Sequence, residues 1–167
     1  MISTKILIAV LAVTVAIVYA QEKWSTKYEN QIHEISKQMK ESGTNSELTA
    51  QAKKSMTNFH EHFKSDLTAY YDKLAKNPEA SNDLKISVGQ WKKKVDEYVI
   101  NFPDTMTDEV VAGKFVDILN YIIHQSEEVF PKAQGKSAPE EETKAFIGSI
   151  LDKLVDCYKS LQTTVKA

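Results

Sequence analysis

The sequence has a single cysteine, Cys157, and no arginine in 167 residues. One cysteine excludes an intramolecular disulfide, and with it the disulfide-rich toxin, inhibitor and growth-factor scaffolds. All 21 basic residues are lysine, so no bidentate guanidinium grip on phosphate or carboxylate can be built. The pattern Asn-x-Ser/Thr is also missing, so N-glycosylation is not expected. The fold must therefore rest on side-chain packing.

The charge balance is slightly acidic, with a formal net charge of -2 at pH 7. A nucleic-acid binder needs a basic surface, so nucleic acid is excluded as a partner. The densest basic run is Lys92-Lys93-Lys94, which follows Trp91. It fits a solvated helix face, the interpretation we favour, or contact with an anionic membrane surface.

The first twenty residues have the pattern of a secretory signal peptide. Lys5 gives a positive start, and an apolar stretch leads to Val18 and Ala20, small residues that a signal peptidase accepts. The apolar stretch is shorter than the roughly 20 residues that a membrane-spanning helix needs. We therefore expect residues 1–20 to be removed. The protein would then be secreted and extracellular, without stable transmembrane anchoring, and residues 21–167 would form a single domain.

The rest of the chain shows one periodicity. Apolar residues recur at spacings of three and four, which places them along one face of a helix. Five segments carry such a stripe: 24–39, 48–74, 84–102, 111–129 and 147–165. No segment of similar length alternates with period two, as a half-buried strand would. We therefore predict an all-α fold, an up-and-down bundle of about five amphipathic helices joined by short connections.

Turn and cap residues mark the expected helix boundaries. Asn77-Pro78 stops the second segment, because a residue before proline is pushed out of the helical region. Ser81 or Asn82 is expected to cap the third segment, and residues 105–108 form a weaker capping pattern for the fourth. Residues 137–140, Ser-Ala-Pro-Glu, predict a capping box at the start of the fifth.

Residues with catalytic or metal-binding chemistry form no recognisable motif. His60 and His62 lie two residues apart, so they point to different sides of a helix and cannot share a metal ion. We expect both to be solvated. None of the usual cysteine-enzyme signatures surrounds Cys157, which we expect to be a buried or half-buried thiol or to link two copies in a disulfide dimer. We predict that the protein is not an enzyme, with no catalytic residue, cofactor or metal.

The functional candidates are the aromatic residues on the stripes. Such side chains fill irregular space, so they form either an ordinary packed core or the lining of an apolar cavity between helices. The candidates for contact with an apolar ligand are Trp24, Tyr28, Phe59, Phe63, Tyr70, Trp91, Tyr98, Phe102, Phe115 and Tyr158.

A second hypothesis is a secreted protein-protein interaction factor, a signal or host-directed effector, with no ligand pocket. Helical bundles serve such roles through an exposed helix face. The candidate contacts for a protein partner are apolar residues beside the stripes: Tyr71, Val99, Ile100, Val110, Tyr121 and Ile123.

In size and architecture the sequence resembles the insect exchangeable apolipoproteins of the apolipophorin-III type. The resemblance covers Glu22 to Val165 and rests on five amphipathic segments, abundant lysine, the lack of a disulfide and short polar turns. It includes no residue motif, so it transfers no lipid-contact residue. With the aromatic stripes, it favours a secreted carrier that binds a fatty acid, a sterol-like molecule or a lipid surface through apolar faces between its helices.

Overall fold

A computed structural model of the chain describes residues 26–34, 37 and 46–165. Every regular element within these ranges is a helix, so the prediction of an all-α fold is confirmed. The elements are a helical segment at 26–34, then α2 (Ser46–Lys76), α3 (Asn82–Glu97), α4 (Asp108–Ser126), the short 3₁₀ helix η1 (Phe130–Ala133) and α5 (Ala138–Val165). The expected signal peptide and Trp24 lie outside the described residues. The five-helix up-and-down topology therefore stays a prediction.

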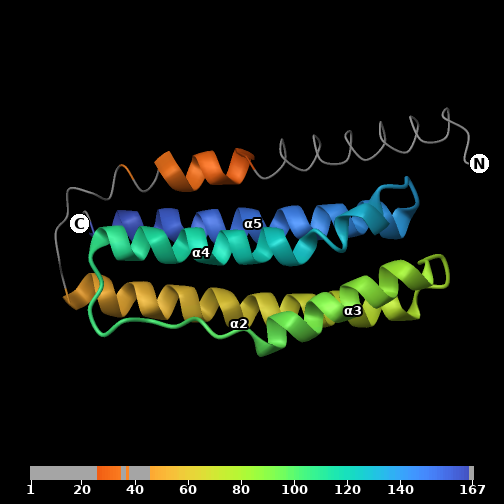
Figure 1. Cartoon of the computed structure of the whole chain (residues 1–167), viewed down its shortest axis with the longest axis horizontal. Helices are drawn as coiled ribbons and strands as arrows, with labels where there is room; N and C mark the ends of the chain where they lie inside the picture. The colour runs from red at the N-terminus through yellow and green to blue at the C-terminus, as the bar shows by residue number, and fades with distance from the viewer. Residues whose placement is uncertain (1–25, 35–36, 38–45, 166–167) are drawn as a thin grey trace, which may run out of the picture.

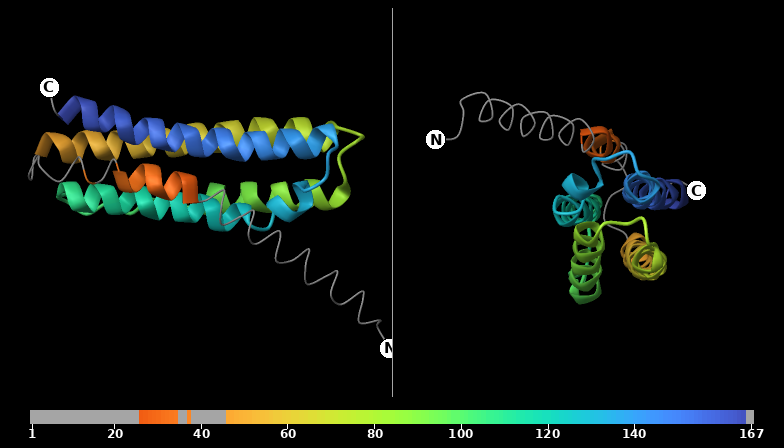
Figure 2. Two further views of the ribbon diagram at one scale, coloured as in Figure 1. Left: turned by 90° about the horizontal axis from the view of Figure 1, so that it is seen from above. Right: turned by 90° about the vertical axis from the view of Figure 1, so that its right-hand side faces the viewer.

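The long helices lie along a common axis, and the chain reverses direction between them (Figure 1). α2 and α4 run one way, whereas α3 and α5 run the other. Seen along this axis, α2 to α5 surround a shared interior, and the segment 26–34 lies outside α4 and α5 (Figure 2). Tyr28 fixes that segment, because its buried ring sits against α5 and its hydroxyl donates to the Gly148 carbonyl at 3.3 Å.

The apolar stripes meet in this shared interior. Trp91 of α3 is 1% exposed and contacts Phe63 of α2 and Phe146 of α5, with ring centroids 5.7 and 6.0 Å away. Phe115 of α4 stacks on Tyr158 of α5 at 4.2 Å, and both are fully buried. Aromatic pairs add about 0.5 to 1.5 kcal/mol beyond the area they bury, so these contacts join all four helices.

α3 ends earlier than the stripe predicts. The stripe runs to residue 102, but the helix stops at Glu97 and Tyr98 has an extended backbone. The Tyr98 amide donates to the Val95 carbonyl, three residues back, and this leaves the Lys94 carbonyl without its usual helical donor. The Tyr121 hydroxyl of α4 donates to that carbonyl at 2.7 Å. A side chain from α4 therefore supplies the hydrogen bond that the last turn of α3 lacks.

The connection at 98–107 is longer than expected and runs along α2 (Figure 1). Buried Thr49 of α2 anchors the connection through Met106. The Thr49 hydroxyl accepts a hydrogen bond from the Met106 amide at 3.1 Å and donates one to the Met106 carbonyl at 3.2 Å. Met106 is fully buried as a result. The N-cap of α4 is Thr107, whose hydroxyl accepts from the Val110 amide, so the capping pattern predicted from Thr105 is wrong by two residues.

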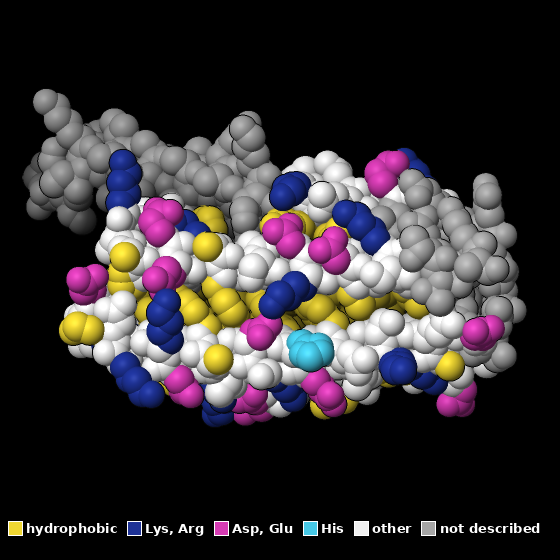
Figure 3. Space-filling view, turned by 180° about the vertical axis from the view of Figure 1, so that it is seen from behind, with side chains coloured by type: hydrophobic (Ala, Val, Ile, Leu, Met, Phe, Trp, Pro, Cys, Tyr) yellow, Lys and Arg dark blue, Asp and Glu magenta, His cyan; other side chains and the backbone are white. Residues whose placement is uncertain are grey.

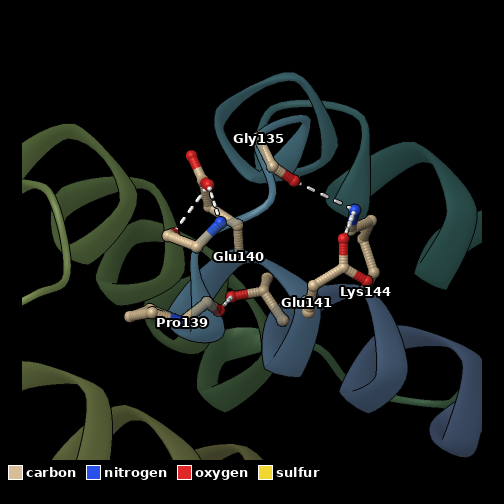
Figure 4. A network of polar contacts seen from close by, with 7 residues as sticks. Gly135, Pro139, Glu140, Glu141 and Lys144 are labelled. Carbon is tan, nitrogen blue, oxygen red and sulfur yellow. Dashed lines mark hydrogen bonds and ion pairs between the residues drawn. The ribbon is translucent and has the colours of Figure 1, made fainter.

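At the start of α5 the structure contains the carboxylate half of the predicted capping box, in which Glu140 accepts from Ser137 (Figure 4). The amide and hydroxyl of Ser137 both donate to the Glu140 carboxylate, at 3.0 and 2.7 Å. These hydrogen bonds lower the pKa of Glu140 below its usual value, the side-chain bond being the larger cause. Lys144 reaches back to the Gly135 carbonyl and also pairs with Glu141, which ties the preceding turn to the helix. The predicted Ser81 cap of α3 is likewise confirmed.

Candidate functional site

A hollow of about 570 Å³ lies between α2 and α5 on the outer side of the bundle. Its apolar residues are Phe59 and Phe63 of α2 and Ile150 of α5, which are 7%, 2% and 0% exposed. Figure 3 shows this face, where a band of hydrophobic side chains runs between two rows of charged ones. The remaining lining residues are Ser55, Asn58, His62, Asp66, Lys153, Asp156, Cys157 and Ser160.

The hollow is open because small side chains occupy positions where the two helices face each other. Ser55 of α2 lies opposite Cys157 of α5, whose sulfur is 3.6 Å from the Ser55 carbonyl oxygen. Ser160 follows on the same side of α5. Neither serine can bridge the gap between two helix backbones, whose axes are typically about 8 to 10 Å apart. The hollow therefore forms above Phe59, Phe63 and Ile150, which themselves stay almost fully buried.

A second hollow of about 340 Å³ continues from the first. The two share Ser55, Asn58 and Ser160, and the second adds Gln51, Lys54 and Leu161. We call the joined hollows the α2–α5 groove. Its α2 side extends from Gln51 to Asp66, which corresponds to roughly 22 Å at the α-helical rise per residue. The groove is therefore long and narrow, and it has an apolar end and a polar end.

Ion pairs border the apolar end of the groove. Lys153 Nζ lies 2.7 Å from an Asp66 oxygen, and this pair crosses from α5 to α2. Lys73 and Glu142 bridge the same two helices with 2.8 Å between nitrogen and oxygen. Both pairs are largely exposed, so each stabilises the fold by at most about 1 kcal/mol. Only Lys153 and Asp66 line the groove, and they place a charged pair at the edge of its apolar floor.

Cys157 is a half-buried free thiol in the groove wall, as the sequence predicts. Burial raises its pKa to about 11. A thiol with this pKa is almost entirely protonated at neutral pH, and the thiolate is the reactive form. Cys157 therefore contributes a small, polarizable wall rather than a nucleophile.

The two histidines of α2 have different surroundings. His62 is exposed and lines the groove. The prediction that His60 is solvated is wrong. His60 is half-buried, and its ring meets the ring of Tyr98 edge-on, with the two centroids 5.4 Å apart. Desolvation, followed by the nearby charge of Lys64, lowers the pKa of His60. Among the described residues, no group of three or more histidine, cysteine or acidic side chains is placed to hold a metal ion.

The ten aromatic candidates divide into three sets. Phe59 and Phe63 line the α2–α5 groove. Trp24 lies outside the described residues. The remaining seven are Tyr98, which is half-buried and stacks on Tyr121, and six residues that are buried in the core or packed against it: Tyr28, Tyr70, Trp91, Phe102, Phe115 and Tyr158. Sequence reasoning missed the polar groove residues, although small residues such as Ser55 and Ser160 beside the stripes were the available signal.

The apolar residues suggested for a protein partner are mostly covered. Val99 is 69% exposed and Val110 is 36% exposed. The other four, Tyr71, Ile100, Tyr121 and Ile123, are partly buried against the core. Val99 and Val110 are thus the most exposed of the six residues, and the interaction hypothesis stays a prediction.

The basic run at 92–94 is locally balanced. Lys92 pairs with Asp96 at 2.6 Å, and Lys94 pairs with Glu128 at 3.1 Å. Lys93 lies 3.9 Å from Glu97. Each lysine has a carboxylate neighbour, which favours the solvated-face interpretation over contact with an anionic membrane.

The chain matches no protein-family model, no curated protein and no solved structure. Within the part of the chain that the structure describes, no helix combines the length and the apolar character needed to cross a membrane. The groove is accordingly interpreted from its own chemistry.

Proposed function

We propose that the protein is a secreted helical carrier that binds the apolar part of a chain-like ligand in the α2–α5 groove. The observation that carries this proposal is the groove itself, with its apolar floor of Phe59, Phe63 and Ile150. Its larger hollow, about 570 Å³, is within the range of small-molecule sites, roughly 300 to 1,000 Å³. Its shape favours a linear molecule over a compact ring system, because the groove is several times longer than a single side chain.

An acyl chain fits these dimensions. One leaflet's chains span about 15 Å, half of the roughly 30 Å hydrocarbon core of a bilayer. The groove length of roughly 22 Å, from Gln51 to Asp66, accommodates such a chain together with a headgroup. The ligand would lie along the groove, with one side against the floor and the other facing solvent.

Apolar contact alone supports only weak binding in such an open groove. Each methylene fully removed from water contributes about 0.8 kcal/mol. Ten half-buried methylenes would contribute about 4 kcal/mol, which corresponds to a Kd near 1 mM before the cost of association. A useful affinity therefore requires additional polar contacts at the rim.

Secretion and the complete architecture belong to the same proposal. The protein would lose residues 1–20 and fold as a five-helix up-and-down bundle, with the segment 26–34 as part of its first helix. Expression in a secreting eukaryotic cell, followed by N-terminal sequencing of the protein in the medium, should give a chain beginning at Gln21. A retained leader on the mature protein would contradict this part of the proposal.

The groove assignment is tested by filling the groove. Asn58 is exposed and lines both hollows, so Asn58→Phe should occupy the groove without disturbing the core. Asn120→Phe is the matched control, since Asn120 is an exposed helical residue outside the groove. Dodecanoate binding, measured by isothermal titration calorimetry, should weaken at least fivefold in Asn58→Phe and remain unchanged in Asn120→Phe. Equal dodecanoate affinity in all three proteins would rule out the groove as the binding site.

A further inference from the structure

At the polar end of the α2–α5 groove lies Lys54, a lysine that has no charged partner within the part of the chain that the structure describes. The two hollows are lined by two lysines, Lys54 and Lys153, and two carboxylates, Asp66 and Asp156. Lys153 pairs with Asp66 at 2.7 Å, and Asp156 lies 3.8 Å from Lys159. Among the described residues, no carboxylate lies within ion-pair distance of Lys54. The charge of Lys54 is therefore available to a ligand at this end.

The groove is also graded along its length. Phe63 and Ile150 lie toward the end closed by Lys153 and Asp66. Within the described ranges, the opposite hollow has one apolar lining residue, Leu161, and no aromatic one; Gln51 and Lys54 are the polar residues that it adds to the shared Ser55, Asn58 and Ser160. An amphiphile would bury its chain against the aromatic floor and place its headgroup beside Lys54.

We propose that the ligand of the groove is a single-chain carboxylate, such as a fatty acid anion, with its headgroup at Lys54. This inference rests on the proposed ligand-binding function and specifies the ligand class. A charge-assisted hydrogen bond from the Lys54 ammonium would supply the polar contact that the open apolar floor requires. The side-chain amide of Asn58 provides a second donor on the same helix turn.

The residue types at this end favour a carboxylate over a phosphate. Phosphate carries up to two charges and is recognised best by several cationic donors or by the fork of arginine. The chain has no arginine, and the polar end of the groove is lined by a single lysine. One ammonium matches one carboxylate in charge. A cationic headgroup would be repelled at this position.

The inference is tested with four probes that share one alkyl chain: dodecanoate, dodecanol, dodecyl phosphate and dodecyltrimethylammonium. The full mature chain should bind dodecanoate about fivefold more tightly than dodecanol at neutral pH, where the carboxylate is ionised, because Lys54 is exposed and an exposed ion pair contributes at most about 1 kcal/mol. Lys54→Gln should reduce dodecanoate affinity about fivefold and leave dodecanol affinity within twofold. Lys136→Gln, which removes an exposed lysine outside the groove, should change neither.

The outcomes separate the two proposals. If dodecanol binds and Lys54→Gln leaves dodecanoate affinity unchanged, the groove function stands and the headgroup assignment is wrong. The headgroup assignment is also overturned if dodecyltrimethylammonium binds as tightly as dodecanoate, or if dodecyl phosphate binds more tightly. If neither dodecanol nor dodecanoate binds, both proposals fall.

Discussion

Tyr98 and Tyr121 stack with ring centroids 3.8 Å apart and planes inclined by 15°. The stack joins the first residue after α3 to the C-terminal half of α4, and the Tyr121 hydroxyl donates to the Lys94 carbonyl at 2.7 Å. These contacts hold the start of the 98–107 connection against the bundle. They explain why α3 stops at Glu97 although the apolar periodicity continues.

Removing the Tyr121 hydroxyl should destabilise the protein. Tyr121→Phe keeps the stack but leaves the Lys94 carbonyl without its donor, which we expect to cost about 1 kcal/mol. The measurement is the free energy of unfolding from urea titration. Tyr71→Phe is the control, because the Tyr71 hydroxyl has no hydrogen-bond partner among the described residues, and it should change stability by less than about 0.5 kcal/mol. Equal losses in both variants would contradict the assigned role of the hydroxyl.

Stability should fall at alkaline pH. Burial, as the largest cause, raises the pKa of both Tyr28 and Tyr121 to about 12 from an ordinary value of 10.0. A raised folded-state pKa means that the neutral phenol is favoured by folding, so its contribution is complete below pH 10 and is lost between pH 10 and 12.

The measurement combines tyrosinate absorbance with helical circular dichroism across this pH window. We expect ionisation of the buried tyrosines to coincide with loss of helix. Complete tyrosine ionisation near pH 10 in a fully helical protein would contradict the burial of these hydroxyls.

The capping box of α5 gives a local test. Ser137→Ala removes the hydroxyl that donates to the Glu140 carboxylate at 2.7 Å, and we expect loss of this hydrogen bond to cost about 1 kcal/mol. Ser65→Ala is the matched control, because Ser65 is an exposed residue in the interior of α2, where alanine is the better helix former. Thermal unfolding should show a lower Tm for Ser137→Ala and an equal or higher Tm for Ser65→Ala. A stable Ser137→Ala variant would show that the box contributes nothing.

The reactivity of Cys157 should follow its raised pKa. A shift from 9.0 to about 11 reduces the thiolate fraction at neutral pH about a hundredfold. The rate of alkylation by iodoacetamide should therefore increase about tenfold per pH unit beyond pH 9, where an ordinary cysteine begins to level off. Short exposures keep the measurement ahead of alkaline unfolding. A rate that levels off at pH 9 would contradict burial of the thiol in the groove wall.

The periodicity of the sequence predicts the helices well where the decisive interactions are local. The stripe residues Met56, Leu67 and Val88 are fully buried, and the proline after Asn77 ends α2 as expected. The end of α3 could not be predicted, because it depends on Tyr121, which lies in another helix. The groove also escaped prediction, since it exists only where Ser55 and Cys157, 102 positions apart in the chain, face each other.

The central claim is that a ligand occupies the α2–α5 groove, and Cys157 in its wall is the most direct reporter. The measurement is the rate of Cys157 alkylation by iodoacetamide at fixed pH, with and without saturating dodecanoate. Glutathione under the same conditions controls for any effect of dodecanoate on the reagent. Occupation of the groove predicts that alkylation slows at least fivefold in the folded protein, while glutathione reacts at an unchanged rate. A Cys157 rate that stays the same with bound dodecanoate would place the ligand elsewhere and contradict the account.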